Sequence, residues 1–548
     1  MYRGSEKNFK DVEQAEKKLI EDRSELIDEV YEQIGYPLSV WAVAATIESL
    51  GIRDVDAVED FGFESVFDLS GEIYKDLKKR VKNEYGGADH IEKFEKKPLV
   101  KRIWTFTKFY AKGLMFSLPM LSQVAAILIF KYSMWAWLRF NAAQATAVAL
   151  GTIAAFVVTG GFTQALGRSV TKFVGEKNYL LAFKATKKIL KTGFLTMVDV
   201  ALGLYLLNII IPFYPQEMLV LALMYYLLIS ALLLASGVLY AFEQRAVILL
   251  FIVAGTGVVI AGMELFHLGI YLSQGAGLLV SLMLFTIYYN IYFYIKLRTN
   301  QPSTKNQSLP ATGILHFINY RYFIYGFVFF LFLFLDRLLA WSAGPPPPAY
   351  IIWFNTPYEL GMDWALLSLF LTVAVLEYSV NMFSRRLMTL QKTAWFNQTD
   401  VYNTYFKKFY HRQLLLIGVV GIGSIIAAYF GINSLRVFRY RIPEIRDFFA
   451  NPMTIRVYWI ASVGYLFFVI GLLHSLFFFR LHKPKYAMYS IIGATLADFL
   501  VGFICSRIFG LEYATVGLLA GALTFALISR NIAKSFFEHL DYHYYSAF

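Results

Sequence analysis

The sequence predicts an all-α polytopic membrane protein with about twelve transmembrane helices in two six-helix bundles, preceded by a small N-terminal soluble helical domain. Hydrophobic residues make up 57% of the 548 residues and charged residues only 16%, and the mean hydropathy is +0.50. Apolar runs recur from about residue 113 onward, each close to the roughly 20 residues that a helix needs to cross a bilayer. The first hundred residues, in contrast, are polar and highly charged.

Residues 1–98 are predicted to form the soluble helical domain. In "DVEQAEKKLIEDRSELIDEVYEQIG", Val12, Leu19 and Val30 recur on one broad helical face. A second apolar helix, "LSVWAVAATIESLG", stops at Gly51 as at a C-cap, and "SVFDLSGEIYKDLKKRVKNEYGG" adds an amphipathic segment. We expect no cleavable signal peptide, because this region has no leading apolar core.

The transmembrane spans follow a basic linker. They are predicted near residues 113–138, 142–166, 193–214, 218–242, 246–263, 270–295, 322–343, 362–383, 413–433, 457–479, 487–509 and 513–530. The polar stretch 297–320, rich in Pro, Ser, Thr and Asn, separates six spans from six. The predicted regions are residues 1–98 (soluble domain), 99–295 (basic linker and first bundle), 296–321 (cytoplasmic linker) and 322–548 (second bundle and short cytoplasmic tail).

The distribution of basic residues predicts the orientation in the membrane. Lys and Arg concentrate after spans two, six, eight and ten, whereas the connection after span three has none. Because cytoplasmic loops carry an excess of Lys and Arg, both termini are predicted to lie in the cytoplasm. The outer segment 434–456 is an exception with five arginines, and is interpreted either as an interfacial amphipathic helix or as an external anionic contact.

Polar residues inside the spans are candidates for a substrate or ion pathway. A charge near the bilayer centre costs about 2.5 to 3.5 kcal/mol on insertion scales, so it is tolerated mainly beside a cavity or a partner. The candidates are Asp199 in span three, Asp336 and Arg337 in span seven, Asp363, Glu377 and Asn381 in span eight, and Asp498 in span eleven.

Helical geometry restricts how these residues can pair. Adjacent residues point about 100° apart, so Asp336 and Arg337 cannot neutralise each other and need separate partners, which we expect first in span eight near Glu377. Asp363 and Glu377 lie within about 40° of one face and about 21 Å apart in height, as two levels of one pathway would. Asn381, one turn beyond, is a predicted hydrogen-bond partner of Glu377.

Several candidates have a purely structural alternative. Arg337 reaches the outer interface in this alternative, with Trp341 as an interfacial anchor. Asp199 forms a hydrogen bond between helices, and Asp363 is a headgroup-level acid at a helix N-terminus. His474, in span ten, is interpreted as a packing histidine rather than a proton relay.

Enzyme, cofactor and metal chemistry find no support in the sequence. It contains no G-x-x-x-x-G-K-[ST], no H-E-x-x-H and no G-x-S-x-G at a plausible strand-to-helix turn. Cys505 is the only cysteine, and His539 and His543 lack a third ligand, so no metal site is predicted. The net charge of +12 is interpreted as membrane topology, with the lipid bilayer and not nucleic acid as the partner.

Two sets of motifs resemble a known superfamily. The run "GGFTQALGRSVTKFVGEKNYLLAFKATKKILKTG", residues 160–193, is similar to the second span and first inner loop of the multidrug/oligosaccharidyl-lipid/polysaccharide (MOP) exporters. "FLDRLLAW", "YEL", Glu377, "YNTYFKKFYHRQ" and "LDYHYY", in this order, resemble the PelG-like transporters of the Pel exopolysaccharide system. The resemblance covers about residues 105–548. It departs from the family at Glu359, where aspartate is more usual, and in the additional charged N-terminal domain.

The resemblance implies a MOP/MATE-like fold in a bacterial inner membrane. It also implies a transporter or flippase that moves a growing or lipid-linked glycan by alternating access, with a cytoplasmic glycosyltransferase and other synthase-complex membrane proteins as partners. Asp336, Glu377 and Asp363 would line the second-bundle cavity, Arg337 would balance or orient the acids, and the N-terminal domain would dock the synthase. A cation-coupled small-molecule antiporter and a non-transporting scaffold of a synthase complex remain alternatives.

Overall fold

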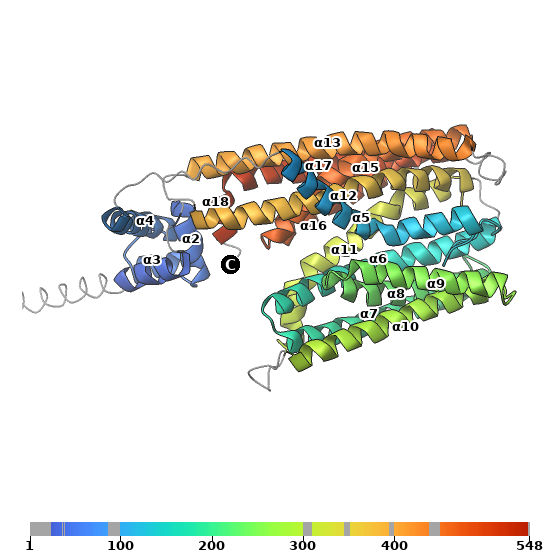
Figure 1. Cartoon of the computed structure of the whole chain (residues 1–548), viewed down its shortest axis with the longest axis horizontal. Coiled ribbons are helices and arrows are strands. Elements are labelled where there is room, and N and C mark those ends of the chain that lie inside the picture. The colour runs from blue at the N-terminus through green and yellow to red at the C-terminus, as the bar shows by residue number, and fades with distance from the viewer. Residues whose placement is uncertain are drawn as a thin grey trace, which may run out of the picture.

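The computed structural model describes residues 23–34, 37, 39–85, 99–299, 309–344, 351–393, 399–437 and 450–545. Within these ranges, twelve helices are long and apolar enough to cross a membrane. The predicted all-α polytopic fold with twelve spans is therefore confirmed, and the chain is a multi-pass membrane protein. Figure 1 shows the helices lying side by side in two groups, with the N-terminal helices at one end.

The twelve long helices form two consecutive sets of six. The first bundle consists of α5 (Leu99–Phe130), α6 (Ala142–Gly175), α7 (Tyr179–Ile210), α8 (Gln216–Ala241), α9 (Arg245–Glu264) and α10 (Ile270–Thr299). The second bundle consists of α11 (Thr312–Trp341), α12 (Thr356–Thr393), α13 (Thr399–Val437), α15 (Pro452–Arg480), α16 (Pro484–Ile508) and α17 (Ala514–Glu538). The short η1 (Leu511–Tyr513) precedes α17, and α18 (Leu540–Tyr545) follows it.

Several helices are longer than their apolar runs. α10 continues to Thr299 and α11 begins at Thr312, so both enter the linker predicted at 296–321. α6 and α7 likewise extend into the basic segment between spans two and three, because Lys and Arg are good helix formers outside the hydrocarbon. The arginine-rich segment predicted at 434–456 lies mostly outside the described residues.

The two bundles meet along two pairs of helices, α5 with α12 and α6 with α11. A Cβ atom added to Gly326 of α11 would lie 2.3 Å from the carbonyl oxygen of Gly160 in α6. A Cβ atom added to Gly113 of α5 would lie 2.2 Å from the carbonyl oxygen of Ala374 in α12. Small residues allow this close approach of membrane helices, so glycine sets the distance between the bundles at both crossings.

The N-terminal helices have a small apolar core of their own. They are residues 23–34, α2 (Val40–Ser49), α3 (Asp54–Glu59) and α4 (Val66–Tyr85). Val30, Val43 and Ile73 are fully buried where these helices pack together. α2 ends just before Gly51, whose φ of +95° suits a glycine after a helix C-terminus, as the sequence predicts.

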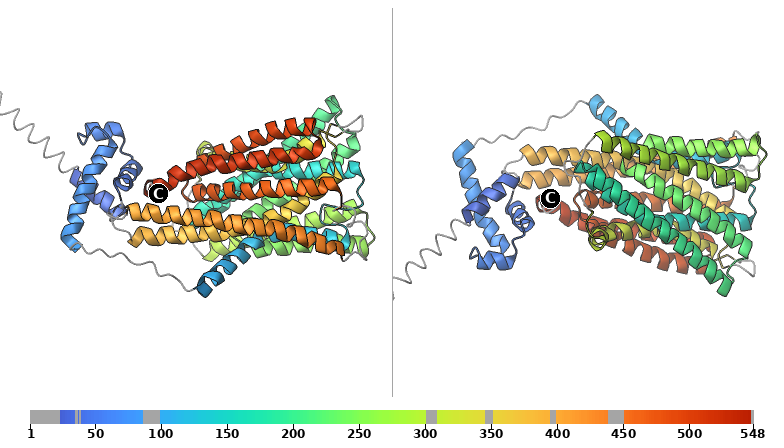
Figure 2. Two further views of the ribbon diagram at one scale, coloured as in Figure 1. Left: turned by 90° about the horizontal axis from the view of Figure 1, so that it is seen from above. Right: turned by 90° about the horizontal axis from the view of Figure 1, so that it is seen from below.

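The N-terminal domain packs against the end of the second bundle (Figure 2). The Trp41 ring of α2 lies 5.3 Å from the His539 ring and 5.6 Å from the Tyr542 ring, between centroids. His543 in turn stacks on Phe536 of α17, with ring centroids 4.7 Å apart. We call this end of the molecule the basic end, because it also holds the basic segment that joins α6 and α7.

Enlarging Gly326 should separate the bundles. We expect Gly326→Leu to lower the melting temperature of the detergent-solubilised protein, because overpacking at a close crossing costs about 1 to 3 kcal/mol. Gly423→Leu on α13 is the matched control, since a Cβ atom at Gly423 meets nothing within 4 Å. Equal melting temperatures for the two variants would contradict the role given to the glycine crossing.

The attachment of α18 should weaken in mild acid. Burial, reinforced by the charge of Lys483, lowers the pKa of His543 from its ordinary 6.5 to about 4. The detached helix therefore binds the proton first, so docking is stable above about pH 6.5 and is lost progressively as the pH falls toward 4. Limited proteolysis between α17 and α18 should become several-fold faster at pH 4.5 than at pH 7.5. The variant His543→Phe, which cannot bind a proton at this position, should show a smaller increase.

Candidate functional site

Asp336 and Arg337 of α11 have separate partners, both supplied by the beginning of α12. The Tyr358 hydroxyl donates to Asp336 Oδ2 at 2.7 Å. Arg337 Nη1 donates to Glu359 Oε2, and both terminal nitrogens of Arg337 lie 3.3 Å from Asp363 Oδ1. Two adjacent residues of one helix thus engage two adjacent residues of the next, as the 100° between neighbours requires.

The Arg337–Glu359 pair is buried, whereas Asp363 lies at the edge of the cluster. The side chains of Arg337 and Glu359 are 9% and 6% exposed, and that of Asp363 is 61% exposed. Loss of one partner of a buried ion pair leaves an uncompensated charge, which is strongly destabilising. Arg337 and Glu359 therefore fix α11 to α12, while the Asp363 carboxylate stays available to solvent or to a ligand.

The expected interfacial placements of Arg337 and Trp341 in span seven are wrong. Arg337 does not reach the outer interface, because Glu359 and Asp363 pair with its guanidinium inside the bundle. Trp341 is buried rather than interfacial, and its ring packs against Phe354 at 5.3 Å between centroids. Asp363, in the second turn of α12, is exposed and pairs with Arg337, so its interpretation as a headgroup-level acid stays a prediction.

Asp498 of α16 is fully buried beside Asp336. Neither of its carboxylate oxygens, nor Asp336 Oδ1, has a hydrogen-bond partner within the described part of the chain. Gly517 of α17 makes room for the carboxylate, since a Cβ atom there would lie 2.7 Å from Asp498 Oδ1. Asp336 is close enough to act electrostatically on Asp498. Two acids that share a dry space repel each other when both are ionised, so this site favours uptake of a proton or a small cation.

The sequence analysis missed two groups of this site. Glu359 was noted only within the "YEL" motif, although it is the shortest-range partner of Arg337. Tyr465 of α15 is fully buried, its hydroxyl has no hydrogen-bond partner among the described residues, and the charges of Arg337 and Asp336 reach it. A tyrosine in an apolar run resembles any packing aromatic, so no sequence signal distinguished it.

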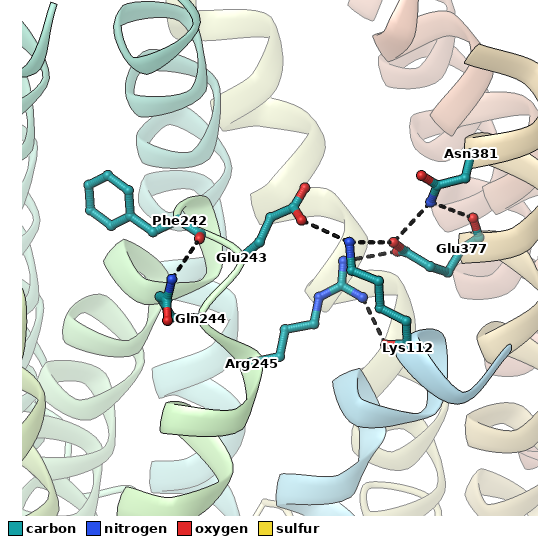
Figure 3. Close-up of polar contacts among 7 residues, drawn as sticks. All are labelled: Lys112, Phe242, Glu243, Gln244, Arg245, Glu377 and Asn381. Atoms are coloured by element: carbon teal, nitrogen blue, oxygen red, sulfur yellow. Dashed lines mark hydrogen bonds and ion pairs between the residues drawn. The ribbon is translucent and has the colours of Figure 1, made fainter. Parts of the chain in front are cut away.

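Glu377 and Asn381 belong to a second cluster, which joins the two bundles (Figure 3). Arg245, the first residue of α9, donates through Nη2 to Glu377 Oε2 at 2.9 Å, and Lys112 Nζ of α5 lies 3.6 Å from Oε1. Asn381 Nδ2 donates to Glu377 Oε1 at 3.0 Å, as the sequence predicts. We call Lys112, Arg245 and Glu377 the interbundle bridge.

Glu377 makes its contacts in a different cluster from Asp336 and Asp363, so the expected cavity lined by all three stays a prediction. Glu377 faces the first bundle because Arg245 and Lys112 provide cations at its own depth. Arg245 and Glu377 have side chains only 15% and 19% exposed, so water screens this pair less than a surface ion pair.

Glu243 extends the interbundle bridge at the connection between α8 and α9. Its Oε2 accepts a hydrogen bond of 2.8 Å from Lys112 Nζ, and this bond lowers the pKa of the Glu243 carboxyl. Arg245 Nη1 also donates to the Lys112 carbonyl oxygen at 2.9 Å. Three charged residues of the first bundle, Lys112, Glu243 and Arg245, therefore gather around Glu377 of the second bundle, and Figure 3 shows the side chains reaching toward each other from both bundles.

At the opposite end the bundles are joined by neutral hydrogen bonds. The Tyr214 hydroxyl donates to the Ile352 carbonyl oxygen at 2.8 Å. The Phe354 backbone N–H donates to Thr146 Oγ1 of α6 at 3.1 Å. The ion pairs between the bundles thus lie toward the basic end, where Asn319 Nδ2 also donates to Ser169 Oγ at 3.0 Å, and the contacts at the opposite end are neutral.

Asp199 and His474 lie outside both clusters. Asp199 is exposed on α7, and no described residue forms a hydrogen bond or ion pair with it. The interhelical hydrogen bond suggested for Asp199 is therefore not formed within the described part of the molecule. His474 is buried between the Tyr410 hydroxyl, at 2.8 Å from Nε2, and Ser529 Oγ, at 2.7 Å from Nδ1, which agrees with a packing role.

Comparison with known proteins identifies the fold. Neither a protein-family model nor a curated protein matches the chain. The outward-facing conformation of a multidrug resistance MATE family transporter of the MOP superfamily aligns with a TM-score of 0.56 and 12% identity, over 80% of this chain and 96% of that one. A MOP superfamily transporter from Pyrococcus furiosus, with a binding pocket described as reversed in polarity, aligns over the same shares with a TM-score of 0.56 and 11% identity.

A third structure, MATE in complex with MaD5, aligns with a TM-score of 0.54 and 13% identity, again over 80% of this chain and 96% of that one. The chain therefore has the fold of MATE and MOP transporters. Identities this low show the fold alone, so the PelG-like resemblance stays a prediction.

Breaking the interbundle bridge should let the bundles separate at the basic end. We expect Glu377→Gln to increase the population of separated bundles about fivefold, because a shielded ion pair contributes about 1 kcal/mol. Spin labels at the basic ends of α9 and α12 would report the distance distribution in nanodiscs. Exchanging the charges, with Arg245→Glu and Glu377→Arg together, should restore the wild-type distribution only in part, because the new arginine would lie beside Lys112.

The ion pair between Arg456 and Glu512 provides the control, since both residues lie in the second bundle, with Nη2 and Oε1 3.0 Å apart. Arg456→Gln should leave the distances between α9 and α12 unchanged. Unchanged distances in Glu377→Gln as well would mean that the bridge does not hold the bundles together.

Proposed function

We propose that this protein is an alternating-access transporter, driven by a proton or small cation at Asp336 and Asp498, that moves a glycan across a bacterial inner membrane. The observation that supports it most is the fully buried Asp498, whose carboxylate has no hydrogen-bond partner in the described part of the chain. An intramembrane acid without a partner is expensive, and such acids typically belong to proton relays and ion pathways.

The positions of the two clusters suggest how uptake at the acids reaches the bundle interface. A proton or cation at Asp498 removes its repulsion with Asp336, whose Oδ2 accepts the hydrogen bond from the Tyr358 hydroxyl. Tyr358 lies in the first turn of α12, and Glu377 of the interbundle bridge lies further along the same helix. A tilt of α12 would therefore couple the charge at Asp336 and Asp498 to opening of the basic end.

The glycan cargo is proposed from the resemblance to PelG-like transporters. Asp363, exposed beside Arg337, offers a carboxylate to sugar hydroxyls or to an amino sugar. We propose that a cytoplasmic glycosyltransferase delivers the polymer to the basic end, where the N-terminal domain packs beside α18 as a docking module. The excess of Lys and Arg at the basic end supports a cytoplasmic location for both termini.

A cation-coupled small-molecule antiporter is the second candidate function. It is favoured by the fold itself, because a multidrug resistance MATE family transporter is among the solved structures that align with this chain. Such an antiporter would move drugs or ions in vesicles without any polymer synthase.

Neutralising the buried acids should abolish coupled transport. We expect Asp498→Asn and Asp336→Asn to reduce polymer secretion in cells, and proton uptake by proteoliposomes containing a pH-sensitive dye, at least about tenfold. Glu217→Gln, an exposed acid in the first turn of α8, is the matched control and should keep both activities.

Three other outcomes would contradict the proposal. Secretion that survives both Asp→Asn changes but is lost on deletion of residues 1–95 would indicate a scaffold. Cation-dependent drug flux in the absence of any glycosyltransferase would indicate the small-molecule antiporter. Variants that lose proton uptake but still secrete polymer would show that the two acids do not drive movement of the cargo.

A further inference from the structure

Asp199 lies on the outward face of α7, in the middle of an apolar surface. α7 packs on α6, α8 and α10 of its own bundle, and in the view from below it crosses the near face of that bundle (Figure 2, right). Leu195, Leu202 and Leu206, within about 60° of Asp199 on the helix, are all exposed. The carboxylate is therefore surrounded by side chains that face lipid.

The carboxylate also lies at mid-depth. Lys191, the last basic residue of α7, precedes Asp199 by about 12 Å along the axis, and the end of the helix at Ile210 follows by about 16 Å. The side chain of an aspartate is too short to reach either interface over such distances. An ionised acid in hydrocarbon needs a partner, and no described residue of the chain provides one, so a basic group of another molecule would satisfy it.

Gly203 gives the same face a notch for close helix packing. It follows Asp199 by one turn, it is exposed, and a Cβ atom added to it would meet nothing within 4 Å. Neighbouring helices in this molecule approach closely at glycines that do meet a partner, such as Gly160 and Gly326. An open glycine beside a polar group is the arrangement through which membrane helices associate.

We propose that this face of α7, formed by Leu195, Asp199, Leu202, Gly203 and Leu206, binds a transmembrane helix of a partner protein that bears a lysine or arginine at mid-depth. Charge complementarity selects this occupant. A second copy of the chain, docked through the same face about a two-fold axis, would bring Asp199 against Asp199, and two like charges repel in a medium of low dielectric constant. A basic side chain neutralises the acid, and the glycine notch lets its helix approach.

The test uses a designed peptide as the partner. A 24-residue transmembrane peptide of Leu and Ala with one central Lys carries an acceptor fluorophore, and a second peptide has Leu in place of the Lys. The full-length protein, labelled with the donor at Glu176→Cys in a Cys505→Ser background, is reconstituted with each peptide in vesicles of zwitterionic lipid. We expect the Lys peptide to reach half-maximal energy transfer at an about tenfold lower peptide-to-lipid ratio than the Leu peptide.

The variants assign the effect to the face itself. Asp199→Asn should raise the half-maximal ratio of the Lys peptide to that of the Leu peptide, and Gly203→Leu should raise it several-fold. Glu217→Gln on α8 and Gly257→Leu on α9 are matched controls, since Glu217 is exposed and a Cβ atom at Gly257 meets nothing within 4 Å. Equal melting temperatures of all variants would show that folding is unaffected.

Equal binding of the two peptides, or Lys-peptide binding that survives Asp199→Asn, would overturn the proposal. Energy transfer between two labelled copies of the protein that disappears with Asp199→Asn would also overturn it, because the face would then serve self-association.

Discussion

The need to compensate charge inside hydrocarbon constrains the whole second bundle. Arg337 is buried in a span, and Glu359 and Asp363 of the neighbouring helix compensate it. The same crossing of α11 with α12 places the Tyr358 hydroxyl on Asp336. Because neighbours on a helix diverge by 100°, these two contacts together define the rotation of both helices about their axes. Asp498, which α16 and α17 place beside Asp336, has no such compensation.

α12 connects the charge cluster around Arg337 and Asp336 to the interface between the bundles. Its first turns hold the α11 cluster, its middle meets α5 at the Gly113 crossing, and Glu377 joins Arg245 one turn further on. The three contacts lie on one continuous helix of 38 residues, so a change of charge at one end has a direct mechanical route to the other. The ionic bridge near the basic end and the neutral hydrogen bonds at the opposite end suit a contact that alternates between two sides.

The site residues show which interactions a sequence reveals. Asn381 and Glu377 are one turn apart on one helix, so their hydrogen bond follows from spacing alone. Arg245 lies 132 positions from Glu377, and a lone arginine at the start of a span resembles any residue of a positive cytoplasmic end. The prediction that span eight supplies the partners of Asp336 and Arg337 is correct. The partners are Tyr358, Glu359 and Asp363 near the beginning of that span, however, and not the predicted Glu377.

The sequence by itself determined the fold class, the twelve spans and most of the intramembrane acids, though not the role of Glu359, because these depend on composition and on spacing within one helix. Only the tertiary structure decided which acids meet which bases, that Asp498 stays uncompensated beside Asp336, and that Asp199 faces outward. The physical reason is that partner choice depends on how each helix is rotated and packed against others far away in the chain. Glycine contacts such as Gly160 with Gly326 set that packing, and no local pattern encodes it.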